Sequence, residues 1–114
     1  MDEAEKGLDN LVYSTLEKIR TKGGVIRKGV NEVTKSLERG QAKLVVSASD
    51  VSPKEIIMHL PLLSKDKNVP YISVGSKQQL GNVVGMTVGA SAIAVTDAGE
   101  EEHSLQELIK KITK

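Results

Sequence analysis

The sequence contains no cysteine, phenylalanine or tryptophan, and its two aromatic residues are Tyr13 and Tyr71. The lack of cysteine excludes a disulfide scaffold, a thiolate metal site and a cysteine nucleophile, and it is consistent with a reducing compartment. Two aromatic rings are too few for stacking to be the main way of holding unpaired bases, which argues against platforms such as the RNA-recognition motif. The core must therefore consist of Val, Leu, Ile, Ala and Met.

Long apolar runs are also missing, since none approaches the ~18 residues that span a bilayer. The first five residues, MDEAE, are acidic and unlike a secretory or organellar presequence. We therefore expect a cytoplasmic protein that does not contact a membrane. The length of 114 residues and the apolar content of 39% fit a single domain over residues 1–114.

The net charge is only +1, but the charges are unevenly distributed along the chain. Residues 18–43 include eight basic and two acidic residues, a local charge of +6, whereas residues 97–107 include five acidic residues and no Lys or Arg. Basic regions attract phosphate and steer association. Chance clustering on a solvated face explains the charges equally well.

Apolar periodicity and turn residues predict helices and strands that alternate along the chain. The strands are expected near 25–26, 44–48, 71–74 and 92–95, and the helices near 4–21, 31–39, 52–66, 76–85 and 104–112. The run at 44–48 is apolar throughout, as in a strand buried on both faces. Alternation of this kind predicts an α/β protein with helices on both faces of a small, mostly four-stranded sheet.

Three Ser-x-x-Glu/Gln motifs, at Ser52, Ser76 and Ser104, are interpreted as capping boxes that start helices. Pro53 would occupy the first helical position of the first motif. Pro61 is expected to kink that helix, because a proline inside a helix removes a hydrogen bond.

Catalytic patterns are not found. Gly24 and Gly29 have the glycine spacing of a phosphate loop, but the next two residues are not the Lys and Ser or Thr of a Walker motif. His59 and His103 share no motif, and His59 is interpreted as structural. We expect no enzymatic activity, no metal and no cofactor, with a hydrolase that uses His59 as a remote alternative.

The segment around the second predicted helix is the strongest candidate for binding. Asn31, Lys35 and Arg39 are spaced four residues apart and therefore line one side of that helix. Their amide, ammonium and guanidinium groups can donate hydrogen bonds to base edges or phosphates. Apolar residues on a different side can pack inward: Val30, Val33 and Leu37.

The start of this helix has two interpretations. Free backbone N–H groups at a helix N-terminus favour anions, and Gly29 allows another backbone to approach closely. Glu32 within a basic region needs hydrogen-bond donors, such as guanine N1–H and N2–H2, which suggests base recognition. Alternatively, Asn31 is an N-cap and Glu32 complements the helix dipole. The residues alone leave both open.

Five stretches carry a resemblance to a known family: RKGVNEVTKSLERG (27–40), AKLVV (42–46), EIIMHLPLL (55–63), NVPY (68–71) and SKQQLG (76–81). In this order and spacing, over roughly residues 20–96, they resemble the kink-turn-binding ribosomal protein family. That family includes the archaeal large-subunit protein of the L-seven-Ae type and relatives in box C/D particles and the spliceosome.

The resemblance implies a three-layer α-β-α sandwich around a small mixed, about four-stranded sheet. It also implies a non-catalytic protein that binds and stabilises kink-turn RNA, a bent helix with tandem sheared G·A pairs. The implied partners are rRNA, box C/D or H/ACA guide RNA and, as a further candidate, RNase P RNA, together with other ribonucleoprotein proteins. The free protein is expected to be a monomer.

Roles follow from the resemblance by position. Asn31, Glu32 and Lys35 resemble the residues that read the G·A pairs. The resemblance further implies that Lys28 and Arg39 contact the RNA backbone and that Lys77 contacts a phosphate. It places Ile56 in the pocket of a flipped-out nucleotide. The loop 86–91 would lie beside that nucleotide, with the residues Val88, Gly89, Ala90 and Ser91. Gly29 and Val30 belong to the same RNA-binding segment.

Two departures from the family pattern bear on selectivity. The loop at Gly89 is one residue shorter than the Pro-Cys version of many archaeal members and resembles the Val-Gly-Ala form of bacterial kink-turn proteins. Ser52 stands where relatives often carry an acid. The alternative to RNA binding is a protein-interaction module with an incidental basic face.

Overall fold

The computed structural model describes residues 3–112, with side chains described from Leu8 onward. The elements are α1 (Glu3–Thr21), β1 (Val25–Lys28), α2 (Val30–Glu38), β2 (Leu44–Ala48), the 3-10 turn η1 (Lys54–Ile56), α3 (His59–Asp66), β3 (Tyr71–Val74), α4 (Lys77–Val83), β4 (Ala92–Asp97), the 3-10 turn η2 (Gly99–Glu101) and α5 (Glu102–Ile112). No helix within the described range is long and apolar enough to cross a membrane.

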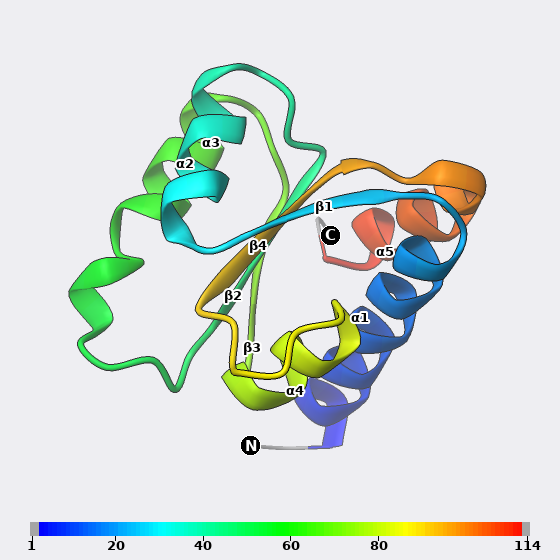
Figure 1. The fold of residues 1–114 in the computed structure, drawn as a ribbon, viewed down its shortest axis with the longest axis horizontal. Coiled ribbons are helices and arrows are strands. Elements are labelled where there is room, and N and C mark those ends of the chain that lie inside the picture. The colour runs from blue at the N-terminus through cyan, green and yellow to red at the C-terminus, as the bar shows by residue number, and fades with distance from the viewer. Residues whose placement is uncertain (1–2, 113–114) are drawn as a thin grey trace.

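The four strands form one mixed sheet in the order β1-β4-β2-β3. β4 pairs antiparallel with both β1 and β2, whereas β2 and β3 are parallel. Helices α2 and α3 cover one face of this sheet, and α1, α4 and α5 cover the other (Figure 1). The expected three-layer sandwich around a four-stranded mixed sheet is therefore confirmed.

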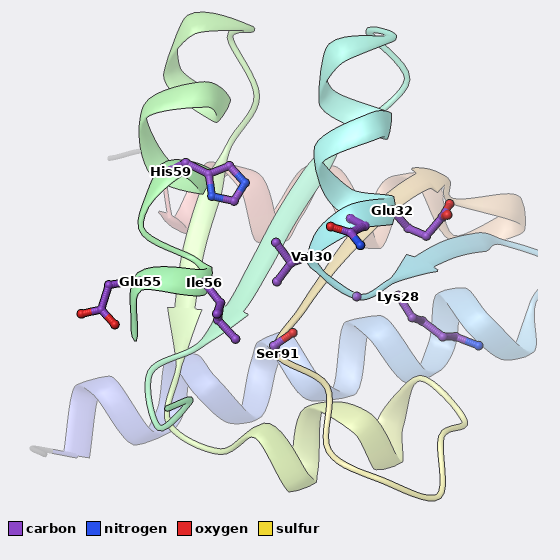
Figure 2. A pocket seen from close by; sticks show the side chains of 9 residues that line it. Lys28, Val30, Glu32, Glu55, Ile56, His59 and Ser91 are labelled. Atoms are coloured by element: carbon purple, nitrogen blue, oxygen red, sulfur yellow. The ribbon is translucent and has the colours of Figure 1, made fainter. Parts of the chain in front are cut away.

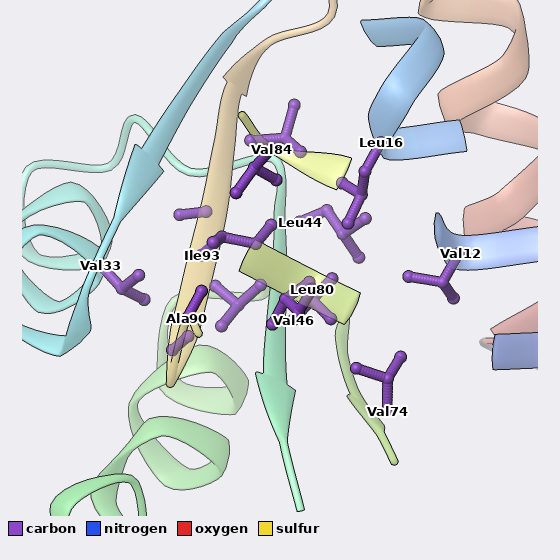
Figure 3. Close-up of a cluster of buried hydrophobic side chains, with 14 of the residues drawn as sticks. Val12, Leu16, Val33, Leu44, Val46, Val74, Leu80, Val84, Ala90 and Ile93 are labelled. Carbon is purple, nitrogen blue, oxygen red and sulfur yellow. The ribbon is translucent and has the colours of Figure 1, made fainter. Parts of the chain in front are cut away.

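The two central strands, β4 and β2, form the centre of the hydrophobic core. All five residues of β2 are buried, and so are the first four of β4. On one face they pack against Val33 of α2, and on the other against Leu16 of α1 and Leu80 of α4 (Figure 3). A strand that is covered on both faces needs an uninterrupted apolar run, and the run at 44–48 provides it.

The Ser52 motif does not start a helix, so that prediction was wrong. Pro53 has an extended backbone with ψ of 151°, no side chain caps η1, and α3 begins only at His59. The apolar residues on either side, Val51 and Ile57, are both buried, so tertiary packing outweighs the local motif here. Pro61 lies in the first turn of α3, where its missing N–H has no partner to lose, and it does not interrupt a longer helix.

The Ser104 motif was also wrongly interpreted as a helix start. Helix α5 begins at Glu102, directly after η2, and Ser104 lies inside it. The Ser104 hydroxyl donates to a carboxylate oxygen of Glu101 at 2.8 Å. Acidic residues at this end of α5 complement the helix dipole, so the helix can begin without the predicted cap.

The Ser76 motif starts α4 as predicted, because the Ser76 hydroxyl accepts the Gln79 N–H at 3.1 Å, but the Gln79 side chain does not complete the capping box. Three side chains from other elements accept the preceding N–H groups. Asp9 Oδ2 accepts from Gly75 at 2.9 Å, Tyr13 Oη from Ser76 at 3.2 Å, and Asp50 Oδ1 from Lys77 at 2.9 Å. The start of α4 is thus closed by hydrogen bonds within the protein.

Gly81 is the point where the loop 86–91 crosses α4. A Cβ built on Gly81 would collide with the Val88 carbonyl oxygen and would lie 3.1 Å from the Ala90 nitrogen. We expect Gly81→Ala to lower the free energy of unfolding by about 1–3 kcal/mol, despite the better helix propensity of alanine. Urea unfolding measures this, and exposed Gln78→Ala on the same helix is the control. Equal midpoints for Gly81→Ala and the wild type would show that the loop yields without strain.

Tyr13 makes the stability depend on pH. Burial is the main reason that the pKa of Tyr13 is raised from 10.0, and the nearby Asp9 and Asp50 act in the same direction, against the hydrogen bond to Ser76. The unfolded chain therefore ionises this hydroxyl first as the pH rises. The stability advantage of the wild type over Tyr13→Phe should be fully present below about pH 10 and should shrink above it. Urea unfolding of both proteins at several pH values tests this, and a constant difference would refute it.

Candidate nucleic-acid interface

An open hollow of about 800 Å³ lies between the start of α2, the segment from η1 to α3, and the beginning of β4. Val30, Ile56 and Ser91 reach its middle from these three places (Figure 2). The residues that line the hollow are Lys28, Gly29, Val30, Asn31, Glu32, Glu55, Ile56, His59 and Ser91. Seven of them were predicted from the sequence as site residues, and the fold brings these seven together.

Gly29 sets the direction in which α2 begins. It is the N-cap residue with φ of 96°, a conformation that favours glycine, while no protein atom lies within 4 Å of a Cβ built on it. Its N–H donates to the Ala92 carbonyl at 2.9 Å, and its own carbonyl accepts from Val33 at 2.9 Å. Glycine is therefore needed here for its backbone conformation, and not because another part of the protein packs against it.

The start of α2 has no side-chain cap. Asn31 is the second residue of the helix and not its N-cap, so that interpretation was wrong. The N–H groups of the first turn, at residues 30–32, have no acceptor within the helix. They lie at the edge of the hollow that these same residues line. In contrast to the closed start of α4, this helix start can receive an acceptor group from a ligand.

Glu32 and Lys35 form an ion pair on the outer side of α2. The Lys35 Nζ lies 3.8 Å from Glu32 Oε1, and the two side chains are 56% and 50% exposed. A surface pair of this kind contributes little to stability, so either group can turn to a ligand at small cost. Lys35 lies one turn beyond the hollow, and Arg39, the C-cap residue of α2, is exposed further along. Neither residue lines the hollow.

The loop 86–91 reaches the hollow only at Ser91. It is held on α4 by the Met86 N–H to the Gly81 carbonyl and by the Ala90 N–H to the Lys77 carbonyl, each at 2.9 Å. Val88 is 61% exposed, whereas Ala90 is buried at 2% exposure. Gly89 lies against Lys77, and none of these four sequence-predicted residues (Lys77, Val88, Gly89 and Ala90) lines the hollow.

The fold adds two residues that were not predicted as site residues, Glu55 and His59. His59, interpreted from the sequence as structural, is exposed, lines the hollow and turns its ring from α3 toward α2 (Figure 2). Its Nε2 lies 2.9 Å from the Thr34 hydroxyl, which donates to the Val30 carbonyl at 2.8 Å. A hydroxyl has one proton, so Thr34 accepts from Nε2–H of His59. Glu55 directly precedes Ile56 in the sequence and His59 follows it by three residues, and this spacing is the signal that could have found them.

Metal ligands do not gather around this hollow. The described residues include no group of three or more His, Asp or Glu side chains that could hold a metal ion. The hollow instead combines a cationic side chain, backbone N–H groups, an amide, carboxylates and two apolar side chains. Such a lining can bind a ligand that presents both hydrogen-bond donors and acceptors around an apolar surface.

Comparison with known proteins agrees with this organisation. Among solved structures, the "15.5kD RNA binding protein" of Giardia lamblia matches with a TM-score of 0.88 at 29% sequence identity, over 98% of this chain and 97% of that one. The profile of the ribosomal protein L7Ae/L30e/S12e/Gadd45 family matches residues 11–104, which include every residue that lines the hollow. The chain therefore belongs to the ribosomal protein L7Ae/L30e/S12e/Gadd45 family.

Proposed function

We propose that this protein is a non-catalytic RNA-binding protein that recognises kink-turn RNA with the hollow and the polar side of α2. The observation that carries the proposal is the uncapped start of α2 at the edge of the hollow, with Asn31 and Glu32 in its first turn. The family match and the likeness to an RNA-binding protein of Giardia lamblia support it.

The polar groups on α2 fit the edges of tandem sheared G·A pairs. The Glu32 carboxylate can only accept hydrogen bonds, so its partner must offer N–H groups. In a sheared G·A pair the guanine N1–H is not used for pairing and remains free to donate. The ammonium of Lys35 and the amide of Asn31 can then donate to the base acceptor atoms beside it. Glu32 is thus the residue that most strongly favours base recognition over simple attraction to phosphate.

The apolar side of the hollow fits an unstacked nucleotide. Val30 and Ile56 face one another across the hollow, with Ser91 below them in this view (Figure 2). The side chain of Ile56 is exposed in the free protein, at 41%. Covering it with the face of a flipped-out base removes apolar surface from water and stabilises the complex.

The mechanism is selection of the bent RNA. A kink-turn that is only partly bent in the absence of protein is shifted to the bent state by the difference between the two affinities. The bent RNA then serves as the starting point for ribonucleoprotein assembly. The particles that we propose are the large ribosomal subunit and box C/D or H/ACA guide-RNA particles, with RNase P as a further candidate.

A second candidate function is protein interaction. Met58 and Leu62 are 63% and 74% exposed at the start of α3, which favours contact with another protein there. An RNA-binding protein will show a steep dependence of RNA affinity on salt, whereas a module that contacts only protein will bind RNA negligibly. This measurement separates the two functions.

Lys35 tests the base-reading part of the proposal. Lys35→Ala should weaken binding to a kink-turn RNA by about 1–3 kcal/mol, because a donor to a base edge is lost. It should also reduce the preference for this RNA over one whose G·A pairs are replaced by Watson–Crick pairs. Fluorescence anisotropy at fixed salt measures both, with Lys111→Ala on α5 as a control of equal charge. Equal binding of the two RNAs by the wild type would refute base reading.

Lys28 tests the phosphate contact. Lys28→Ala should weaken binding similarly for all RNA sequences and reduce the slope of log affinity against log salt by about 0.7–0.9, the equivalent of one neutralised phosphate. Titrations at four or more salt concentrations measure the slope. The Lys111→Ala protein should retain the wild-type slope, and an unchanged slope for Lys28→Ala would exclude a phosphate contact at this residue.

A further inference from the structure

Ala92, the first residue of β4, and the two residues before it connect three parts of the protein. Each of three consecutive residues makes one backbone hydrogen bond to a different element. The Ala90 N–H donates to the Lys77 carbonyl (2.9 Å), the Ser91 carbonyl accepts from Ala48 (3.0 Å), and the Ala92 carbonyl accepts from Gly29 (2.9 Å). The position of Ser91 in the hollow therefore depends on α4, β2 and the start of α2 together.

Asp50 is hydrogen-bonded to Lys77, the residue at one of these three connections, from outside the hollow. Its Oδ1 accepts the Lys77 N–H at 2.9 Å, and the carbonyl of the same Lys77 accepts the Ala90 N–H at 2.9 Å. Lys77 is the first residue of α4, so its N–H has no partner within the helix. A hydrogen bond to a carboxylate is short and strong. Asp50, Lys77 and Ala90 thus form a continuous chain of hydrogen bonds.

The loop follows the Lys77 backbone closely. A Cβ built on Gly89 would lie 3.1 Å from Lys77 Cγ and 3.4 Å from the Lys77 carbonyl carbon and oxygen. The loop therefore lies directly on this residue, with little space between them. A shift of the Lys77 carbonyl therefore acts on the loop through its hydrogen bond to Ala90.

We propose that Asp50 is a positioning residue for RNA selectivity, which fixes the loop 86–91 through Lys77 and so sets the wall that Ser91 contributes to the hollow. This inference rests on the proposed function, and it concerns the flipped-out nucleotide and not the G·A pairs. Asp50 does not line the hollow itself. Its negative charge alone would weaken binding to all RNAs alike, so a charge effect tightens all complexes equally when Asp50 is removed, whereas positioning changes their ratios.

Asp9 offers a matched control. Its carboxylate accepts the Gly75 N–H at 2.9 Å, only two residues before Lys77. Within the described residues, Gly75 makes no hydrogen bond to the loop 86–91. Asp9→Ala and Asp50→Ala therefore each remove one carboxylate that accepts a hydrogen bond from the start of α4. Only Asp50→Ala breaks the series of hydrogen bonds that reaches Ala90.

The experiment compares three kink-turn RNAs that carry uridine, cytidine or an abasic site at the flipped-out position. We expect Asp50→Ala to change the ratios between their affinities by roughly 2- to 30-fold, the range seen for residues that act through a neighbour. Asp50→Asn should restore the wild-type ratios, because its amide oxygen still accepts a hydrogen bond. Asp9→Ala should keep the wild-type ratios, and none of the variants should alter the dependence on the G·A pairs.

Two results would overturn the proposal. If Asp50→Ala and Asp9→Ala changed the ratios equally, Asp50 would be merely structural. If Asp50→Ala and Asp50→Asn both tightened binding to all three RNAs alike, its charge alone would matter.

Amide hydrogen exchange of Ala90 in the free protein separates this inference from the proposed function. Asp50→Ala should accelerate that exchange, and Asp9→Ala should not. Failure of the wild type to bind any kink-turn RNA would refute the proposed function while the exchange still tested the chain of hydrogen bonds. Unchanged exchange in Asp50→Ala would refute the positioning role.

Discussion

Three hydrogen bonds at Ala90, Ser91 and Ala92 hold together the parts of the protein that surround the hollow. Ala90 and Ala92 are almost fully buried, so their backbone groups must find partners within the protein. Their partners lie on α4 and at the residue before α2, and Ser91 between them is tied to β2. Because β4 also lies between β1 and β2 in the sheet, this one short segment fixes the loop 86–91 relative to the start of α2.

The helices α4 and α2 both begin near this segment, but only the start of α4 is capped by side chains. Four side chains, from α1, from the loop after β2 and from Ser76 itself, accept the N–H groups at the start of α4. The start of α2 has glycine as its N-cap and no side-chain acceptor, although a Ser, Thr, Asn or Asp cap would contribute a few tenths of a kcal/mol more than glycine. Burial of Val33 and Leu37 holds α2 in place instead. An uncapped helix start held by its apolar side is suited to receive acceptor groups from a ligand.

Patterns that depend on one element were predictable from the sequence, and those that depend on contacts between elements were not. The apolar run of β2 and the inward positions Val33 and Leu37 follow from periodicity alone, and they are buried as predicted. The motifs at Ser52 and Ser104 are identical in kind to that at Ser76, but only Ser76 has a neighbouring structure that keeps it at a helix start. The contact of His59 with Thr34 could not be predicted, because it depends on how α3 lies beside α2.

Under the proposed function, the scarcity of aromatic side chains limits how this hollow binds RNA. Tyr13 is buried against the start of α4, and the Tyr71 hydroxyl is hydrogen-bonded to the Ser47 hydroxyl. Neither ring lines the hollow. Without an aromatic platform, the protein gains little from stacking on flexible single-stranded bases. Under the proposed function, it instead matches fixed hydrogen-bonding groups and a small apolar wall to the bent state of the RNA that it selects. A kink-turn presents both a rigid pair of G·A edges and one unstacked nucleotide, and under the proposed function this is why a bent duplex, and not an unpaired strand, is the fitting partner.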